Sequence, residues 1–282
     1  MRNLISNIKA IIKRNRFLFK YYLVLSKIKR KVIVRLDNYR FRRYLNVYKN
    51  GEIIFKILDM GEITRMRADL FESKEPETLN WIDSFSKDDS FIDIGANLGV
   101  YSLYAALKNH NVISIEPDAL NYALLNINII ENNLSNLIIA YNLSIHESSI
   151  FSSFNISSYE WGGALNSFDN NKDYRGEEFK PVHYQGSYGI PLDEFLDKTD
   201  FCPNHIKIDV DGNEYLILKG AFNTLRSKSL LSVLVELDES RDDYLDSIEL
   251  IKSAGLNLTE KTHAEMFDKG EYATTYNHIF RR

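Results

Sequence analysis

An apolar run that ends in a glycine turn constrains the fold of this chain more than any other segment. Residues 91–101 read Phe-Ile-Asp-Ile-Gly-Ala-Asn-Leu-Gly-Val-Tyr. The apolar residues before Gly95 predict a buried strand, and a helix is expected to begin at about Leu98. Gly95 and Gly99 lack the Cβ atoms that would block a tight turn and close packing of helix on strand. This unit is typical of open α/β sheets, which bind ligands at the carboxyl ends of their strands.

The alternation of short apolar runs with helical stretches continues along the chain. Strands are expected at 91–94, 112–115, 137–140, 206–210 and 230–236, and helices near 98–108, 118–132, 192–198, 213–227 and 241–254. Such alternation predicts a parallel sheet that is covered by helices on both faces. The expected fold class is therefore α/β, with a Rossmann-like sheet.

Composition divides the chain into three parts. Residues 1–43 hold 14 of the 35 Lys and Arg residues but one of the 39 acids, and they read as a basic amphipathic helical arm. Residues 44–90 read as a small lead-in, with short strands at 51–71 and a helix at 76–85. Residues 91–282 form the main domain. It carries an insertion at about 141–189 that is rich in Ser, Asn, Gly and Tyr, and we expect this insertion to be a substrate loop.

The basic arm has three interpretations that the sequence leaves open. Its apolar residues recur at seven-residue spacing, namely Leu4, Ile11, Leu18, Leu25 and Val32. This stripe can lie on an anionic membrane surface, pair with a second copy, or pack on the body of the protein. No apolar run is long enough for a transmembrane span, and a lone cysteine, Cys202, fits a reducing compartment. We expect a cytoplasmic protein, with peripheral contact at the inner membrane face as one interpretation of the arm.

Two acids flank the glycine turn. Asp93 lies at the end of the expected strand, and Glu116, followed by Pro117, ends the next strand 21 residues after Gly95. A carboxylate in the position of Glu116 can accept hydrogen bonds from both hydroxyls of a ribose. The G-x-x-x-G spacing matches a dinucleotide loop poorly, and an adjacent acid would repel a pyrophosphate. S-adenosylmethionine carries a ribose and two cationic groups but no phosphate, so it is the expected ligand.

Several motifs in a fixed order extend this pattern. They are Asp93-Ile-Gly-Ala-Asn-Leu-Gly-Val-Tyr-Ser102, Glu116-Pro117, Leu192-Asp-Glu-Phe-Leu196, Lys207-Ile-Asp-Val-Asp-Gly-Asn-Glu214, Leu218-Lys-Gly-Ala221 and Lys74-Glu-Pro-Glu-Thr-Leu-Asn-Trp81. From about residue 44 onward the chain resembles the FkbM family of S-adenosylmethionine-dependent methyltransferases. The resemblance implies the class I methyltransferase sheet, with its last strand antiparallel, and O-methylation of sugars or polyketide-type metabolites. Asp211 and Asn213 depart from the family, in which Glu and Ala are commoner, and the basic arm lies outside the resemblance.

The strand at 206–210 brings further acids to the ligand-binding edge. Strand alternation places Lys207, Asp209 and Asp211 on one face, and Glu214 follows at the start of the next helix. A sugar hydroxyl is a very weak acid, so its methylation benefits from a base. We expect Asp209 or Asp211 to be that base or to orient the acceptor, with Glu214 and Lys207 in support. A capping role stays open for Glu214, and a divalent cation is compatible with these carboxylates but not required, so no metal site is predicted.

The predicted function combines these residues. The cofactor-binding set is Glu75, Asp93, Gly95, Asn97, Gly99, Tyr101, Glu116, Pro117 and Asn142. Sugar-binding rings are expected from Tyr159, Trp161, Tyr174 and Tyr184, and further groups that can reach the acceptor cleft are Glu236 and His263. The leading hypothesis is O-methylation of a sugar hydroxyl on a glycan or glycosylated intermediate, as in surface polysaccharide biosynthesis. The alternatives are methylation of a small secondary metabolite and a non-catalytic dimerising scaffold, whereas the acidic body argues against nucleic acid.

Overall fold

The computed structural model describes residues 24, 27–29, 45–50, 53–263, 268–270 and 272–282. The chain divides into two units, residues 1–45 and residues 46–282, and the second contains the fold described below. The predicted arm, 1–43, lies outside the described residues except for residues 24 and 27–29, which are helical. Within the described residues, no helix is both long enough and apolar enough to cross a membrane.

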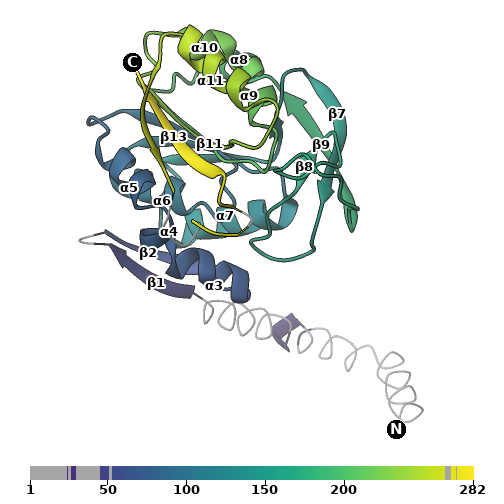
Figure 1. The fold of residues 1–282 in the computed structure, drawn as a ribbon. Helices are drawn as coiled ribbons and strands as arrows, with labels where there is room; N and C mark the ends of the chain where they lie inside the picture. Colours follow the sequence, from purple (N-terminus) through teal and green to yellow (C-terminus); the bar gives the residue numbers. More distant parts are fainter. Residues whose placement is uncertain (1–23, 25–26, 30–44, 51–52, 264–267, 271) are drawn as a thin grey trace. The chain divides into compact units, whose positions relative to one another are not determined.

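A seven-stranded sheet, in the order β12-β13-β11-β10-β3-β4-β5, forms the centre of residues 46–282 (Figure 1). Its strands are β3 (Ser90–Ile94), β4 (Asn111–Ile115), β5 (Ile138–Tyr141), β10 (His205–Ile208), β11 (Ser232–Asp238), β12 (Asn257–Thr262) and β13 (Thr275–Arg281). The neighbours from β5 to β11 pair in parallel, whereas β13 is antiparallel to both β11 and β12. This reversed strand is the one that the resemblance implied. The predicted α/β fold class and class I methyltransferase sheet are confirmed.

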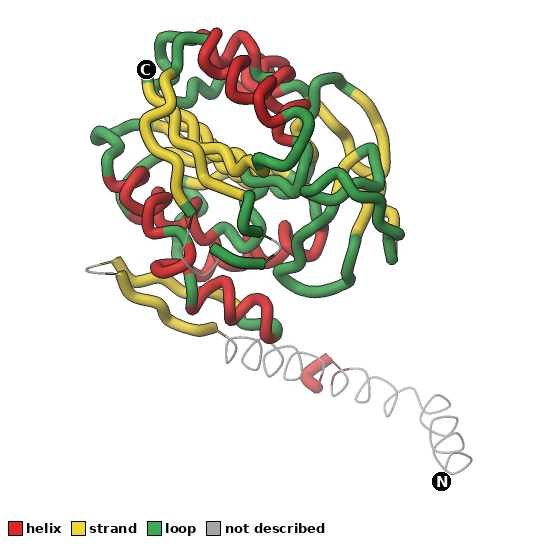
Figure 2. The backbone as a smooth tube through the Cα atoms, viewed as in Figure 1, coloured by secondary structure: helices red, strands yellow, loops and turns green. Residues whose placement is uncertain are grey.

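Helices cover both faces of the sheet (Figure 2). One face carries α5 (Pro76–Asp83), α6 (Val100–Leu107) and α7 (Ala119–Glu131), and the other carries α8 (Leu192–Thr199), α9 (Glu214–Gly220), α10 (Phe222–Arg226) and α11 (Tyr244–Ser253). On the second face, apolar strand residues such as Ile206 and Val233 pack with Ile217 and Ile251 in one buried core. Because helices exclude water from both faces, every residue of β10 is buried, His205 and Lys207 included, and β3 and β4 are buried after their first residue.

The predicted helix at 213–227 is wrong in one respect, because the structure has two helices there. Helix α9 ends at Gly220, and α10 begins at Phe222. A Cβ atom added at Gly220 would lie 2.2 Å from the carbonyl oxygen of His146. The close approach of the His146 backbone explains why residue 220 is a glycine. The helical periodicity of the sequence does not indicate this contact. The other predicted helices and strands agree with the structure to within a few residues.

The lead-in differs more from its prediction. Strands β1 (Leu45–Asn50) and β2 (Ile53–Leu58) form a two-stranded sheet, but the helices α3 (Glu62–Asp69) and α4 (Phe71–Lys74) occupy the rest of the segment expected as strands. The turn before α3 is held by the side chains of Asp59 and Thr64, which accept hydrogen bonds from the amides of Gly61 (3.0 Å) and Met60 (2.8 Å). Such local bonds between side chain and backbone favour a turn over a continued strand.

The insertion at 141–189 is built on a sheet rather than being an open loop. Its strands are β6 (Ser144–Ile145), β7 (Ile150–Ile156), β8 (Ser167–Phe168) and β9 (His183–Ile190), in the order β6-β9-β7-β8. Strands β7 and β9 pair antiparallel from Ile150 opposite Gly189 to Ile156 opposite His183. Phe154, Ile156 and Phe168 form a small core. The polar residues between them resemble a loop in the sequence, because alternate residues of an exposed sheet face solvent.

Candidate active site

Adjacent strands deliver the predicted site residues to one edge of the sheet. Gly95 follows β3, Glu116 follows β4, Asp209 follows β10, and Glu236 lies near the end of β11. Two pockets open at this edge, with about 620 Å³ and about 1400 Å³ of space, open solvent included. Residues common to both linings are Gly95, Asn97, Ala164, Asp209 and Asp211, so the smaller and the larger pocket meet beside the glycine turn.

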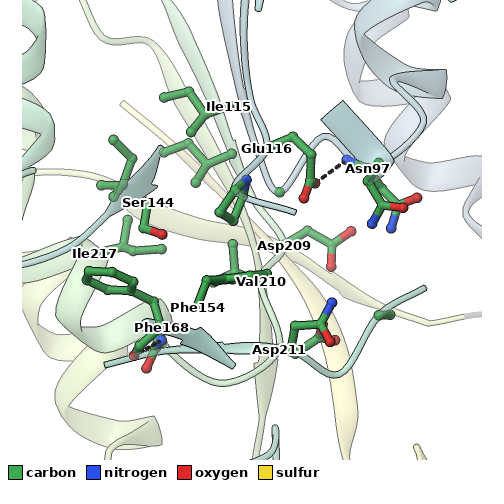
Figure 3. A pocket seen from close by; sticks show the side chains of 18 of the residues that line it. Asn97, Ile115, Glu116, Ser144, Phe154, Phe168, Asp209, Val210, Asp211 and Ile217 are labelled. Atoms are coloured by element: carbon green, nitrogen blue, oxygen red, sulfur yellow. Dashed lines mark hydrogen bonds between the residues drawn. The ribbon is translucent and has the colours of Figure 1, made fainter. Parts of the chain in front are cut away.

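Glu116 is the carboxyl group of the smaller pocket (Figure 3). Its two oxygens accept hydrogen bonds from the amides of Asn97 (2.7 Å) and Asp118 (2.8 Å), which fix its orientation. Burial raises the pKa of Glu116 to about 8, although these two amides favour the charged form. Each carboxylate oxygen has more than one lone pair, so both can still accept a hydroxyl.

Apolar side chains form the opposite side of the smaller pocket. They come from the insertion and from α9, and are Ile145, Phe154, Phe168 and Ile217. Asn121 and Asn166 also line this pocket, and sequence reasoning missed all six residues. A buried amide on the apolar face of a predicted helix was an available signal for Asn121. Its side chain binds the insertion through two hydrogen bonds of 2.9 Å. It donates one to the carbonyl of Gly163 and accepts the other from the amide of Gly162.

The two glycines of the turn have different roles. Gly95 has a φ of +84°, and a Cβ atom there would lie 1.9 Å from the backbone oxygen of Asp209, so β3 and β10 approach each other without room for a side chain. Gly99 lines neither pocket. A Cβ atom there would lie 2.3 Å from a methyl carbon of Leu125, so this glycine lets α6 pack on α7. Of the two glycines, Gly95 lines both pockets, and donor binding by Gly99 stays a prediction.

An ion pair between the buried Lys207 and the half-buried Asp209 lines the larger pocket. The Nζ atom of Lys207 lies 2.5 Å from Oδ2 of Asp209 and 4.9 Å from the ring centre of Tyr101. Burial alone would raise the pKa of Asp209, but Lys207 and Lys74 outweigh it and hold this pKa at about 2. Burial likewise opposes the charge of Lys207, yet Asp209 and Glu75 raise its pKa. The pair therefore stays ionised at neutral pH.

Glu75 is a second buried carboxylate of the larger pocket. It is 3% exposed and accepts hydrogen bonds from Nζ of Lys74 (2.9 Å) and Oγ1 of Thr78 (3.1 Å). Burial disfavours its charge, but Lys74 and Lys207 lower its pKa below the ordinary value. Glu75 and Tyr101 both line the larger pocket, which adjoins the glycine turn.

The two remaining predicted acids, Asp211 and Glu214, accept hydrogen bonds from backbone amides near the site. Asp211 lines both pockets, and its Oδ2 atom accepts a hydrogen bond from the amide of Leu165 at 2.5 Å. Burial and the neighbouring Asp209 raise its pKa to about 6. Glu214 lines neither pocket and accepts from the amide of Gly212 at 3.0 Å, in line with the capping interpretation. Burial raises the pKa of Glu214 to about 8.

Two of the predicted cofactor-binding residues lie behind the pockets rather than in them. Asp93 is 1% exposed and accepts a hydrogen bond from Ser102 at 2.6 Å, and its pKa is raised by burial. The side chain of Asn142 donates to the carbonyls of Glu116 and Pro117, both at 2.8 Å. Asn142 therefore positions the segment that carries Glu116. Pro117 itself lines the smaller pocket.

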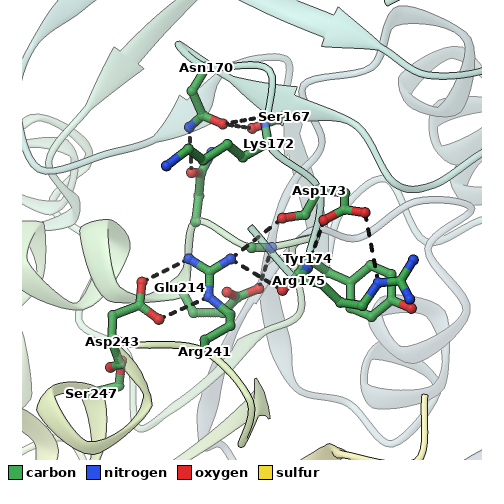
Figure 4. Close-up of polar contacts among 12 residues, drawn as sticks. Ser167, Asn170, Lys172, Asp173, Tyr174, Arg175, Glu214, Arg241, Asp243 and Ser247 are labelled. Atoms are coloured by element: carbon green, nitrogen blue, oxygen red, sulfur yellow. Dashed lines mark hydrogen bonds and ion pairs between the residues drawn. The ribbon is translucent and has the colours of Figure 1, made fainter. Parts of the chain in front are cut away.

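The aromatic residues predicted for sugar binding do not line either pocket. Tyr159, Trp161, Tyr174 and Tyr184 are all absent from both linings, and in their place Tyr272 and His263 line the larger pocket. Figure 4 shows how the segment of Tyr174 is held. Arg241 donates to the carbonyl of Tyr174 at 3.2 Å and pairs with Asp243 at 2.8 Å. Sugar binding by the four insertion residues stays a prediction.

The residues present fit S-adenosylmethionine. Glu116 can bind a ribose, the apolar wall of the smaller pocket suits an adenine, and Glu75 can accept an ammonium group in the larger pocket. Gly95 leaves the junction of the two pockets free of a side chain. Among the described residues, no group of three or more His, Cys, Asp or Glu side chains is arranged to hold a metal ion.

The sheet order, the reversed strand and the acids at the strand ends define a class I methyltransferase, the class whose methyl donor is S-adenosylmethionine. The profile of the FkbM methyltransferase domain matches residues 93–258, more than half of the chain. The chain therefore belongs to the FkbM methyltransferase family, as its motifs predicted.

Solved structures with a similar fold include several methyltransferases. The FkbM methyltransferase of Methylobacillus flagellatus is 17% identical with a TM-score of 0.49, over 78% of this chain and 52% of that one. Fibrillarin of Aeropyrum pernix, with natively bound S-adenosyl-L-methionine, is 9% identical with a TM-score of 0.46, over 84% and 82%. TYW2 of P. horikoshii, in complex with MeSAdo, is 13% identical with a TM-score of 0.45, over 84% and 70%. This chain thus spans about half the length of the M. flagellatus protein, and no curated protein sequence matches it.

Proposed function

We propose that this protein transfers a methyl group from S-adenosylmethionine to a sugar hydroxyl of a glycan or glycosylated intermediate. The observation that carries the proposal is the meeting of two pockets at Asp209. One is a small pocket with a ribose-binding carboxyl, and the other is a larger pocket lined by polar and aromatic groups. Membership of the FkbM family supports methyl transfer. The size of the larger pocket, and the rings and hydrogen-bonding groups among its lining residues, support a sugar as the acceptor.

The donor would be held by groups already described. Glu116 would bind the ribose, Phe154 and Phe168 would contact the adenine, and Glu75 would accept the ammonium group. S-adenosylmethionine supplies an electrophilic methyl group on a cationic sulfur. The protein's part is to bind this donor away from water and to align an oxygen with it, which can contribute several kcal/mol to catalysis.

The acceptor would bind in the larger pocket, against the connection between β12 and β13. His263, Tyr272, Thr275 and Asn277 line that side and offer rings and hydrogen-bonding groups to a sugar. Asp209 is fixed by Lys207 and stays ionised, so it can accept a hydrogen bond from the acceptor hydroxyl and orient its oxygen. We assign Asp209 this orienting role, with Lys207 as the group that positions it.

Methyl transfer to defined carbohydrates tests the proposal. The full-length protein would be incubated with S-adenosylmethionine carrying a labelled methyl group and with polysaccharide, oligosaccharide and nucleotide-sugar fractions of the host. We expect label in a carbohydrate fraction and, by mass spectrometry, the mass of one added methylene per site. Label in a small non-carbohydrate metabolite would support the alternative acceptor class. Absence of donor binding by calorimetry would contradict the proposal and favour a non-catalytic scaffold.

A further inference from the structure

Glu236 lines the larger pocket, and none of the roles assigned above involves its carboxyl group. Strands β10 and β11 are parallel with Ile208 opposite Val235, so the next residues, Asp209 and Glu236, are neighbours at the carboxyl edge. The side chain of Glu236 is half-buried and makes no hydrogen bond or ion pair with any residue that the structure describes. It is thus a carboxyl group beside the acceptor-orienting aspartate, and none of the described residues pairs with it.

Charged groups surround Glu236 on several sides. Lys207 and Asp209 come from β10, and Lys74 and Glu75 come from the end of α4 and the start of α5. Burial is the main cause of a raised pKa for Glu236, followed by the negative charge of Asp209. Lys74 and Lys207 act against this rise without cancelling it, so the pKa lies well above its ordinary value. Other ionisable groups that line the same pocket are Arg67, Tyr101, Asp211, His263 and Tyr272.

The other acids at this edge are less suited to receive a proton. Asp209 is held by Lys207 and has a pKa of about 2, so it binds a proton weakly. Asp211 accepts the amide of Leu165, and Glu214 lies outside both pockets. Because its pKa is raised, Glu236 binds a proton more strongly than Asp209 does, as a general base requires. When two adjacent carboxyl groups have well-separated pKa values, one commonly exchanges a proton with the substrate while the other stays ionised.

We propose that Glu236 is the general base that takes the proton of the acceptor hydroxyl, an inference that rests on the proposed methyltransferase function. In this step the acceptor oxygen forms a bond to the methyl carbon, and the carbon–sulfur bond breaks with its electron pair left on sulfur. The hydroxyl O–H bond breaks, and its proton passes to the Glu236 carboxylate. Asp209 orients the acceptor oxygen while Glu236 removes its proton.

The charge of the donor provides a way to observe Glu236 without a known acceptor. A nearby cation favours the ionised form of a carboxyl group. S-adenosylmethionine brings a sulfonium cation, whereas the product S-adenosylhomocysteine has a neutral sulfur. Glu236 is therefore expected to release its proton when the donor binds and to keep it when the product binds. Proton release from Glu116 occurs with both ligands, because both carry the ribose, and it cancels in the comparison.

The test is calorimetric titration of the full-length protein at neutral pH with S-adenosylmethionine and with S-adenosylhomocysteine. Buffers of different ionisation enthalpy convert the heats into protons released per ligand bound. We expect the wild-type protein to release up to about one proton more with the donor than with the product. Glu236→Gln should abolish this difference while still binding the product. Glu249→Gln, the same change at an exposed position of α11, should keep it.

The outcomes separate this inference from the proposed function. If the wild-type protein binds neither ligand, the proposed function fails. If both ligands bind but release equal numbers of protons, or if the difference persists in Glu236→Gln, Glu236 is not the base. Should Glu236→Gln fail to bind the product, Glu236→Asp decides, because it must move the pH at which the extra proton is released. An unchanged pH midpoint in that variant would also overturn the assignment.

Discussion

Asp209, Asp211 and Glu214 lie within six residues of one another and have very different acidities. The pKa is about 2 for Asp209, which Lys207 neutralises, and about 6 for Asp211, which lies beside that negative charge. The pKa of Glu214 is about 8, because burial raises it and hydrogen bonds from backbone amides lower it only in part. The sequence places these acids at the correct edge of the sheet. It does not decide whether Asp209 or Asp211 pairs with Lys207, because strand alternation places both acids on the face of this lysine, and burial and the further charge of Lys74 depend on the folded structure.

Replacing Glu214 with glutamine tests its structural role. The folded protein keeps the Glu214 proton up to about pH 8, whereas the unfolded chain releases it above about pH 4.5, so this residue's contribution to stability is lost as pH rises between these values. Glu214→Gln should be close to the wild type near pH 5 and exceed its unfolding free energy by about 4 kcal/mol at pH 8. Denaturant unfolding at both pH values measures the effect. Loss of methyl transfer in this variant would contradict the assignment of Glu214 outside the site.

Replacing Glu116 with glutamine tests ribose recognition. The hydroxyls of a ribose favour the ionised carboxyl, whose pKa is about 8 in the free protein, so affinity for S-adenosylhomocysteine should rise with pH from 6 to about 8. Glu116→Gln should weaken binding about 10- to 100-fold and remove this pH dependence. Calorimetry across this pH range measures both effects. Undiminished affinity in the variant would show that Glu116 does not bind the ribose.

Segments far apart in the sequence build the site at the level of whole elements. The turn after β3 supplies the junction of the pockets, and the insertion closes the smaller pocket through Phe154 and Phe168. The side-chain amides of Asn97 and Asn121 both donate a hydrogen bond to the carbonyl of Gly163, at 2.9 Å, and connect the insertion to the sheet. The sequence identified the turn by its glycines. It did not show that the insertion belongs to the site, because these contacts span 42 residues or more.

The turn after β3 is expected to tolerate no side chain. In Gly95→Ala the added Cβ would lie 1.9 Å from the backbone oxygen of Asp209, at a φ of +84°, so β10 would have to move. We expect a loss of about 2 kcal/mol or more of stability and at least tenfold weaker donor binding. Thermal unfolding and calorimetry measure the two effects. Gly186→Ala is the matched control, because a Cβ atom there meets nothing within 4 Å and should leave both quantities unchanged.

The described residues that line the two pockets belong to the unit formed by residues 46–282. The basic arm, 1–43, carries a strong positive charge, which suggests contact with an anionic surface. We propose peripheral binding to an anionic membrane as the role of the arm, with self-association as the competing proposal. The sequence shows the difference in charge between the arm and the rest of the chain, but it does not show which partner the arm binds.

Removal of residues 1–44 separates these proposals. The shortened protein should bind S-adenosylmethionine with unchanged affinity, because the donor contacts predicted for the site lie after residue 44. Sedimentation with vesicles should show that the full-length chain binds anionic but not neutral lipid, less strongly at high salt, and that the shortened chain binds neither. A change from dimer to monomer in analytical ultracentrifugation, without any vesicle binding by the full-length chain, would favour self-association instead.

The sequence by itself determined the α/β class, the glycine turn, the acids at the strand ends and the FkbM family. These features are local, since periodicity, glycine spacing and strand ends depend on residues close together in the chain. Only the tertiary structure decided that Lys207 neutralises Asp209, that Glu236 stands beside this pair, and that the insertion forms one wall of the smaller pocket. The reason is physical, because ionisation and pocket shape depend on burial and on neighbours that folding brings together from distant segments.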